Sequence, residues 1–314
     1  MGMRPDHVMF GADPVPDRSW GEPRTSGTSV LTVTALLRLG EAGAERPVLL
    51  VDDRYYDLGP LTDDIDAAFL AAGGVATARL ALAEGRLTEL PDAASLRIGA
   101  PVARPGAVLC IGQNYAAHAA ESGSAPPEHP ILFFKHPNTV VGPFDDIVRP
   151  DGADALDWEV ELGVVIGTAA WHVAEADALA HVAGYLVGND VSERTWQRSE
   201  SGGQWSKGKT APTFCPLGPW LVPADEVDPT SMHIWSRISG DPRQGSSTAD
   251  MVFSVAELIA DLSRYVRLEP GDVLLTGTPE GVAMSGRFPY LVAGDVVEVG
   301  VDGLGAQRST VVAG

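Results

Sequence analysis

The sequence predicts a mostly β protein with peripheral helices, an α+β fold, that carries a small N-terminal α/β accessory domain. From about residue 104 onward, short apolar runs alternate with turns rich in Gly and Pro, and few segments show helical periodicity. Before that point, strand-like runs precede an Ala- and Leu-rich helical stretch. No internal repeat is visible, which excludes solenoid and propeller architectures. The pattern therefore favours one large β-rich domain and one smaller domain.

The N-terminal third divides into a tail and the accessory domain. Residues 1–28 carry Pro, Gly, Asp and Ser without apolar periodicity, so we expect a flexible tail without function. Residues 29–103 contain strand-like runs at 31–37 and 47–58, followed by a helical stretch over 63–82. This order predicts a small α/β unit.

The remaining residues, 104–314, form the predicted catalytic domain. A Pro-containing link, Pro101 to Pro105, marks its start. Its clearest helix is expected from Ser254 to about Val266, because Ser254 and Glu257 have the spacing of a capping box before an apolar run. The other segments of this domain are predicted to be short strands.

Charge and composition exclude several classes of function. The 314 residues include 42 acidic and 22 basic side chains, a formal net charge of -20, which repels nucleic acid and anionic membrane surfaces. No apolar stretch has the length of a membrane span, and the first residues lack the apolar core of a signal peptide, so we expect a cytoplasmic protein. Cys110 and Cys215 sit beside apolar residues and are predicted to be buried free thiols.

The run Asp157–Ile166 sets acidic side chains into an apolar strand. Alternation puts Asp157, Glu159 and Glu161 on one face, about 7 Å apart at each step. Like charges so close repel one another, and a hard divalent cation such as Mg2+, which prefers oxygen ligands, would relieve the repulsion. The alternative is the solvent-facing edge of an amphipathic strand.

A second candidate feature is the pair His118 and Glu121. At a spacing of three residues on a helix, the two side chains can hydrogen-bond, and a carboxylate that orients an imidazole suits a general base acting on water. The loop at 122–127, Gly-Ser-Ala-Pro-Pro in its last five residues, could tether this helix as a lid over substrate. The alternative is an ordinary surface pair.

Asp190 is expected at the turn that ends a strand, after the apolar run at 184–187, and could complete a three-acid site with Glu159 and Glu161. Its alternative role is the N-cap of a short helix that begins near Ser192.

Two turn-rich segments complete the candidate site. The stretch 202–210 presents two lysines and matches the spacing of a phosphate-binding loop, but Pro212 blocks the helix that such a loop requires. In the second segment, 274–281, a strand enters a tight turn whose hydroxyls and amides could bind a substrate carboxylate. An ordinary strand exit is the alternative.

Together these segments resemble the fumarylacetoacetate hydrolase family over about residues 104–314. The motifs occur in the family's order: Gly112-Gln113-Asn114-Tyr115 through His118, Asp157-Trp158-Glu159-Val160-Glu161, Asn189-Asp190-Val191-Ser192-Glu193-Arg194, Gly208-Lys209-Thr210, and Leu268-Glu269-Pro270-Gly271-Asp272-Val273 through Thr276-Gly277-Thr278-Pro279. The resemblance implies a mixed β-sandwich roll and a homodimer. Within the family, the sequence motifs most resemble those of the acylpyruvate and 2,4-diketo-3-deoxy-L-fuconate hydrolases.

The resemblance also implies a role for each site residue. Glu159, Glu161 and Asp190 match the metal ligands for Mg2+ or Mn2+. The catalytic residues are implied to be His118, Glu121 and Lys209, and the positions near substrate are Arg194, Gln197 and Thr278. Two positions depart from the pattern: Ile111 stands where some members have a further Asp ligand, and Thr210-Ala211-Pro212 stands where many have Ser and Asp.

The expected function is metal-dependent hydrolysis of a carbon–carbon bond in a small 2-oxo acid, either an acylpyruvate or a 2,4-diketo-3-deoxy sugar acid, to pyruvate and a carboxylic acid. The same metal–enolate chemistry without attack by water would give a decarboxylase of oxaloacetate-like acids or a keto–enol isomerase. A non-catalytic, metal-stabilised binding protein is the alternative from a different class. It would leave the histidine and lysine beside the acids without a role.

Overall fold

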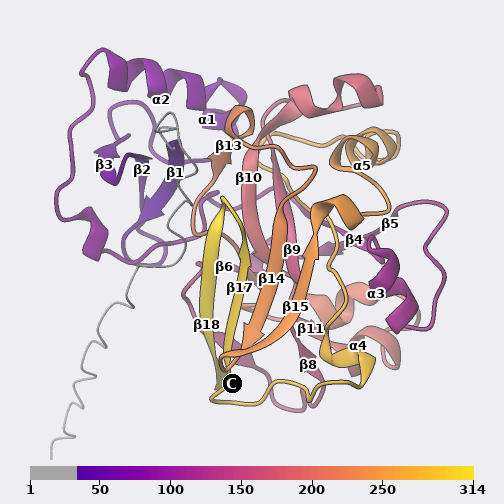
Figure 1. The fold of residues 1–314 in the computed structure, drawn as a ribbon. Helices are drawn as coiled ribbons and strands as arrows, with labels where there is room; N and C mark the ends of the chain where they lie inside the picture. Colours follow the sequence, from indigo (N-terminus) through magenta and orange to yellow (C-terminus); the bar gives the residue numbers. More distant parts are fainter. Residues whose placement is uncertain (1–33) are drawn as a thin grey trace, which may run out of the picture.

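The computed structural model describes residues 34–314, so the predicted tail at 1–28 lies outside the described residues. The N-terminal part forms a three-stranded antiparallel sheet and two short helices (Figure 1): β1 (Thr34–Leu39), β2 (Arg46–Val51), β3 (Arg54–Asp57), α1 (Ala67–Ala71) and α2 (Gly74–Ala83). The single helical stretch expected over 63–82 is wrong. Gly73, with φ at 71°, adopts the left-handed conformation that glycine tolerates and separates the two helices.

The larger part contains a six-stranded mixed sheet. Its strand order is β13 (Val222–Pro223), β10 (Val182–Asn189), β9 (Val160–Ile166), β16 (Val273–Leu275), β4 (Val108–Gly112) and β5 (Ile131–Lys135). Strand β16 pairs parallel with β4, and the other neighbours pair antiparallel. The sheet thus joins strands from both halves of the chain, so that segments far apart in sequence meet at its ends.

A five-stranded sheet forms the second layer. Its order is β15 (Asp241–Ser247), β14 (His233–Ile238), β17 (Val296–Val301), β18 (Gly305–Ala313) and β7 (Ile147–Arg149). Two small pairs lie outside the sheets: β8 (Leu156–Asp157) with β11 (Ser192–Glu193), and β6 (Val140–Val141) with β12 (Cys215–Pro216).

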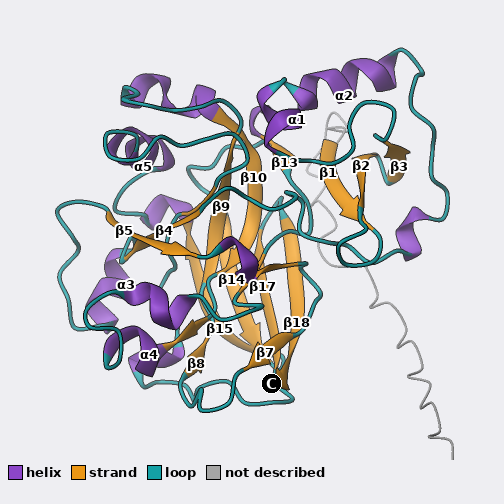
Figure 2. Ribbon diagram, turned by 180° about the vertical axis from the view of Figure 1, so that it is seen from behind, coloured by secondary structure: helices purple, strands orange, loops and turns teal. Residues whose placement is uncertain are grey.

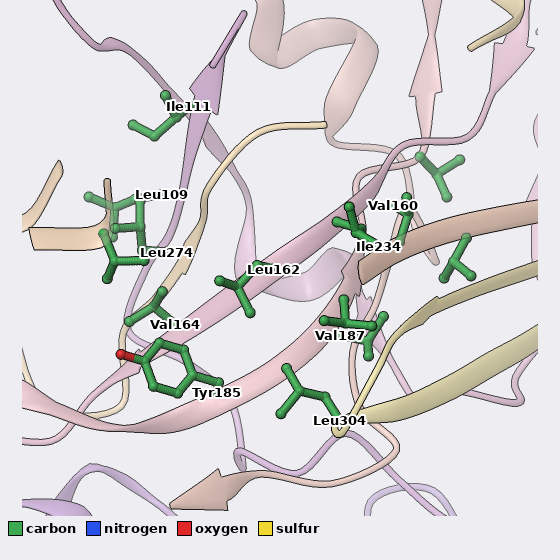
Figure 3. Close-up of a cluster of buried hydrophobic side chains, with 14 of the residues drawn as sticks. Leu109, Ile111, Val160, Leu162, Val164, Tyr185, Val187, Ile234, Leu274 and Leu304 are labelled. Atoms are coloured by element: carbon green, nitrogen blue, oxygen red, sulfur yellow. The ribbon is translucent and has the colours of Figure 1, made fainter. Parts of the chain in front are cut away.

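The two large sheets pack face to face over a common hydrophobic core. Val160, Leu162 and Val164 of β9 point into it, as the alternation of the sequence predicts. Figure 3 shows Ile234 of β14 beside Val160, and Leu304 of the turn between β17 and β18 near Val187 of β10. The predicted fold class, mostly β with peripheral helices in a mixed sandwich, is confirmed.

The helices lie at the periphery of the sheets. They are α3 (Ala116–Glu121), α4 (Arg194–Arg198) and α5 (Val255–Leu262). Both views place α3 and α4 side by side, away from β1 to β3 (Figure 2). Helix α5 begins with the predicted capping box of Ser254 and Glu257, but it ends at Leu262 instead of Val266. None of the helices within 34–314 is both long and apolar enough to cross a membrane.

Short 3-10 helices connect many of the strands, at Ala93–Ser95, Pro137–Thr139, Glu175–His181, Trp205–Lys209, Ala224–Glu226, Thr248–Asp250 and Ala283–Ser285. The segment 202–210, which formally matched a phosphate-binding loop, contains the 3-10 helix Trp205–Lys209, and this does not continue into an α-helix.

The N-terminal segment shares a hydrophobic cluster with the larger part. Leu36 and Leu49 pack in one cluster with Val165 and Leu186, and the backbones of Leu36 and Leu221 exchange two hydrogen bonds. The division at about residue 103 stays a prediction. Cys110 and Cys215 are buried free thiols, as predicted.

Candidate active site

Three carboxylates meet where β9 begins and β10 ends. The antiparallel register sets Asn189 opposite Val160, and the amide of Asp190 donates to the carbonyl of Glu159 at 2.9 Å. As a result, Glu159, Glu161 and Asp190 each present an oxygen within 4.8 Å of the others. Their exposed fractions are 4%, 1% and 0%, so the alternative of a solvent-facing strand edge is wrong.

Asp157 does not join this group, although the same alternation predicted it on the same face. The strand is interrupted at residues 158 and 159, and Asp157 lies on the short strand β8. Its carboxylate accepts hydrogen bonds from the amides of Ala283 and Met284, both at 2.9 Å, and from Arg194 at 2.8 Å. Asp157 therefore holds a loop and an arginine in place.

The alternative role of Asp190 as a helix N-cap is also wrong. Helix α4 begins at Arg194, and its N-cap is Glu193, whose carboxylate accepts from the amide of Trp196. Asp190 is thereby free to face the other acids.

Cationic side chains surround the three acids. Lys209 donates to Asp190 at 2.7 Å and to Glu159, and Arg194 donates to the other oxygen of Glu159 at 2.7 Å. Lys135, which the sequence analysis did not identify, donates to Asp190 at 2.5 Å. The sequence offers one indication of this role: Lys135 ends the apolar strand Ile131–Lys135, and a charge at a buried strand end needs a partner.

Glu161 is the least compensated of the acids. Within residues 34–314, its carboxylate accepts one hydrogen bond, from the amide of Gly277 at 2.7 Å. Burial and the negative charges of Asp190 and Glu159 raise the pKa of Glu161 well above its ordinary value. Burial would also raise the pKa of Glu159, but Arg194 and Lys209 outweigh burial and hold that pKa well below the usual range.

The donor set fits a hard divalent cation. A carboxylate offers about four lone-pair directions, so the hydrogen bonds from Lys135, Lys209 and Arg194 leave each acid with capacity for a metal. The raised pKa of Glu161 shows a concentration of negative charge that such an ion would relieve. Oxygen ligands of this kind suit Mg2+ or Mn2+ better than a soft metal.

The predicted pair of His118 and Glu121 forms on α3. Nδ1 of His118 lies 3.0 Å from Oε1 of Glu121, and the amide of Gly281 donates to both oxygens of Glu121 at 3.2 Å. His118 is 5% exposed, so the surface-pair alternative is wrong. Because Nδ1 faces the carboxylate, Nε2 is left to accept a proton.

Two side-chain amides for which the sequence predicted no role hold the surrounding turns. Asn114 donates to the carbonyls of Phe253 and Thr276 at 3.0 and 2.8 Å, which fixes the approach to α3. Gln244 donates to the hydroxyl of Thr278 at 2.7 Å. No local spacing predicts these contacts, since Phe253, Thr276 and Thr278 lie 34 or more residues from the side chain that donates to them.

The turn at 276–279 uses most of its polar groups within the protein. The Thr278 hydroxyl donates to the carbonyl of Val160 at 2.8 Å, and the Thr276 hydroxyl donates to that of Leu162 at 3.0 Å. The hydroxyl protons expected to bind a substrate carboxylate are thus engaged. Thr278 would meet a substrate as an acceptor.

One pocket of about 260 Å³ gathers most of the candidate residues. Its lining includes seven of the nine: His118, Glu159, Glu161, Arg194, Gln197, Lys209 and Thr278. Glu121 and Asp190 stand directly behind it, in contact with His118 and Lys209. The arrangement can hold a cation, position a proton acceptor next to it and stabilise negative charge with Lys209.

This fold and this site define a mixed β-sandwich protein whose pocket joins a buried carboxylate cluster to a histidine–carboxylate pair. The chain belongs to the fumarylacetoacetate hydrolase family: residues 107–312 match the model of the fumarylacetoacetate hydrolase C-terminal domain. A protein of Burkholderia multivorans, provisionally named a hydrolase, is 49% identical over 277 residues, which cover 87% of this chain and 96% of that protein.

Solved structures of the family include hydrolases and isomerases. The fumarylacetoacetate hydrolase of Exiguobacterium antarcticum is 34% identical with a TM-score of 0.76, and covers 90% of this chain and 100% of its own. The 5-carboxymethyl-2-hydroxymuconate delta-isomerase of Mycobacterium smegmatis is 33% identical, with a TM-score of 0.71 and coverages of 89% and 99%. The maleylpyruvate hydrolase of Sphingobium sp. SYK-6, solved with Mn2+ and pyruvate, is 28% identical, with a TM-score of 0.74 and the same coverages.

Proposed function

We propose that the protein is a metal-dependent hydrolase that cleaves the carbon–carbon bond of a 2,4-dioxo acid to pyruvate and a carboxylic acid. The proposal rests on one observation: His118 and the acidic cluster lie at the same pocket, and Glu121 is hydrogen-bonded to the histidine. A metal site that served only stability would not require a buried imidazole whose free nitrogen faces that pocket. The proposal thus favours an enzyme over a metal-stabilised binding protein.

Glu159, Glu161 and Asp190 would hold Mg2+ or Mn2+. When bound, the ion supplies Lewis acidity toward the 2-oxo group and carboxylate of the substrate. Arg194 and Lys209 keep Glu159 ionised and oriented for that role, and Lys135 does the same for Asp190.

His118 acts as the general base. Its Nε2 takes a proton from water, whose oxygen forms a bond to the C4 carbonyl of the substrate. The C3–C4 bond then breaks, and its electron pair moves into a pyruvate enolate that Lys209 stabilises. His118 returns its proton to C3, and the new carboxylic acid loses its own proton to solvent. Glu121 keeps the imidazole in the tautomer that these steps need.

Arg194, Gln197 and Thr278 would position the substrate. Arg194 donates to Glu159 and to Gln197 at 3.0 Å, so it links the metal site to the wall of the pocket. The homodimer expected from the resemblance and the cytoplasmic location expected from the absence of a membrane span and a signal-peptide core stay predictions.

Turnover of an acylpyruvate panel, with products identified by mass, tests the proposal. The panel includes a 2,4-dioxo sugar acid and oxaloacetate, with and without Mg2+. Release of pyruvate and a second acid, only with metal, supports the hydrolase. Absence of both products across the panel in metal-loaded protein contradicts it.

Isomerisation is the second candidate, and the similarity to the M. smegmatis isomerase favours it. It requires the same metal and enolate without attack by water. An isomerised product of unchanged mass would support it, whereas release of CO2 from oxaloacetate would indicate a decarboxylase.

A further inference from the structure

Charged side chains of very different burial line the pocket. Glu159, Glu161 and Lys209 are each exposed by 4% or less. Arg198, an exposed residue, lines the same pocket from the last residue of α4. A substrate whose 2-oxo acid group lies at the acids therefore occupies the same pocket as Arg198.

Arg198 differs from the other cations of the pocket in having no counter-charge. Arg194, one helical turn earlier, donates to Asp157, Glu159 and Gln197, and Lys209 donates to two acids. Within the described part of the chain, Arg198 forms no hydrogen bond and no ion pair. Its guanidinium thus keeps its donors for a ligand.

An unpaired hydroxyl and a residue with an unusual backbone conformation lie on the same lining. Ser122, the residue after α3, has a buried Oγ with no hydrogen-bond partner. Gln113 lines the pocket with φ at 56°, a left-handed conformation that non-glycine residues rarely adopt. Buried hydroxyls are normally bonded, and strained residues gather at binding sites, so both features indicate contact with a ligand.

We infer that Arg198 selects substrates whose acyl group carries a second carboxylate, with Ser122 and Gln113 as polar neighbours of that group. The inference rests on the proposed function for its substrate backbone, because it assumes a 2-oxo acid at the carboxylate cluster. An arginine and a carboxylate form a charge-assisted, often bidentate contact, which makes the arginine a selector of dianionic substrates.

Binding of non-cleavable 2-oxo acids tests this inference separately from catalysis. Calorimetry on Mg2+-loaded protein compares 2-oxoglutarate and 2-oxoadipate with 2-oxopentanoate and 2-oxohexanoate, which lack the distal carboxylate. At least one diacid should bind about tenfold more tightly than the monoacid of equal length. Arg198→Ala should remove that difference in affinity. Arg198→Lys should keep part of it, because lysine retains the positive charge but lacks the two-pronged guanidinium.

Arg287→Ala is the matched control, because Arg287 is an exposed arginine that stacks on Phe288 and does not line the pocket. It should bind like the wild type. Equal affinities for diacids and monoacids in the wild-type protein would overturn the inference, as would an unchanged preference in Arg198→Ala.

Turnover of succinylpyruvate and butyrylpyruvate distinguishes the two proposals. A preference of kcat/KM for succinylpyruvate that Arg198→Ala abolishes supports both. If neither compound is cleaved but the diacid preference in binding depends on Arg198, the subsite stands and the hydrolase assignment fails. Cleavage of both at equal kcat/KM supports the hydrolase and overturns the selector.

Discussion

The ammonium group of Lys135 lies 2.5 Å from Oδ1 of Asp190, and both side chains are fully buried. The second oxygen of Asp190 accepts from Lys209 at 2.7 Å, so the carboxylate is held between two lysines. Lys135 also donates to the carbonyl of Val191 at 3.0 Å, which ties the end of β5 to the loop after β10. Lys135 thus fixes the orientation in which Asp190 faces Glu159 and Glu161.

Lys135→Met should lower the free energy of unfolding by about 3 kcal/mol, because it leaves Asp190 buried with one cation instead of two. Urea denaturation of metal-free protein measures the effect. Lys207→Met is the control, since Lys207 is exposed and bonds only the carbonyl of Glu200. Equal losses in the two variants would mean that Lys135 contributes no more than a surface lysine.

His118→Ala should reduce turnover by at least about 100-fold, because it removes the proposed general base. Mn2+ binding, followed by electron paramagnetic resonance, should persist because the three acids are untouched. His136→Ala, at an exposed histidine outside this pocket, should leave turnover unchanged. Retained turnover in His118→Ala would remove the histidine from the mechanism.

Metal affinity should rise as the pH rises. The pKa of Glu161 is raised well above its ordinary value in the metal-free protein, so metal binding must displace a proton below that pKa. Because the pKa of Glu161 is higher in the folded than in the unfolded protein, folding without metal takes up a proton. The stability of the metal-free protein therefore falls as the pH rises past the pKa of Glu161 in the unfolded chain. The gain in Tm on adding Mg2+ should therefore increase as the pH rises above the ordinary glutamate pKa of about 4.3.

Calorimetry in two buffers of different ionisation enthalpy measures the proton release. Glu161→Gln should abolish the part of the pH dependence that Glu161 causes, and should weaken binding at every pH. Mg2+ binding with the same affinity and no proton release across this range would contradict the assignment of Glu161 as a ligand.

Asn114→Ala should destabilise the protein by about 3 kcal/mol, since three hydrogen bonds of a fully buried side chain are lost at about 1 kcal/mol each. Thermal and urea unfolding measure the change. Asn138→Ala, at an exposed asparagine, should cost about 0.5 kcal/mol or less. A loss in Asn114→Ala as small as in the control would show that the turns at Phe253 and Thr276 hold without it.

Local patterns in the sequence were sufficient for much of the fold and part of the site. Alternation in β9 separates Val160 and Leu162, which face the core, from Glu161, because side chains along a strand point to opposite faces. The spacing of Ser254 and Glu257 placed the start of α5, and that of His118 and Glu121 placed their contact, since both depend on a single helical turn.

Contacts between residues distant in sequence were visible only in the tertiary structure. Lys135 and Asp190 are 55 residues apart, and Asn114 is 139 residues from Phe253, so no local period reports either contact. Asp157 shares the parity of Glu159 and Glu161, yet its partners Arg194 and Ala283 draw it out of their group. The types and local spacing of the side chains show which residues could bind a cation or a proton. Long-range pairing of strands and loops brings some of them together and keeps others apart.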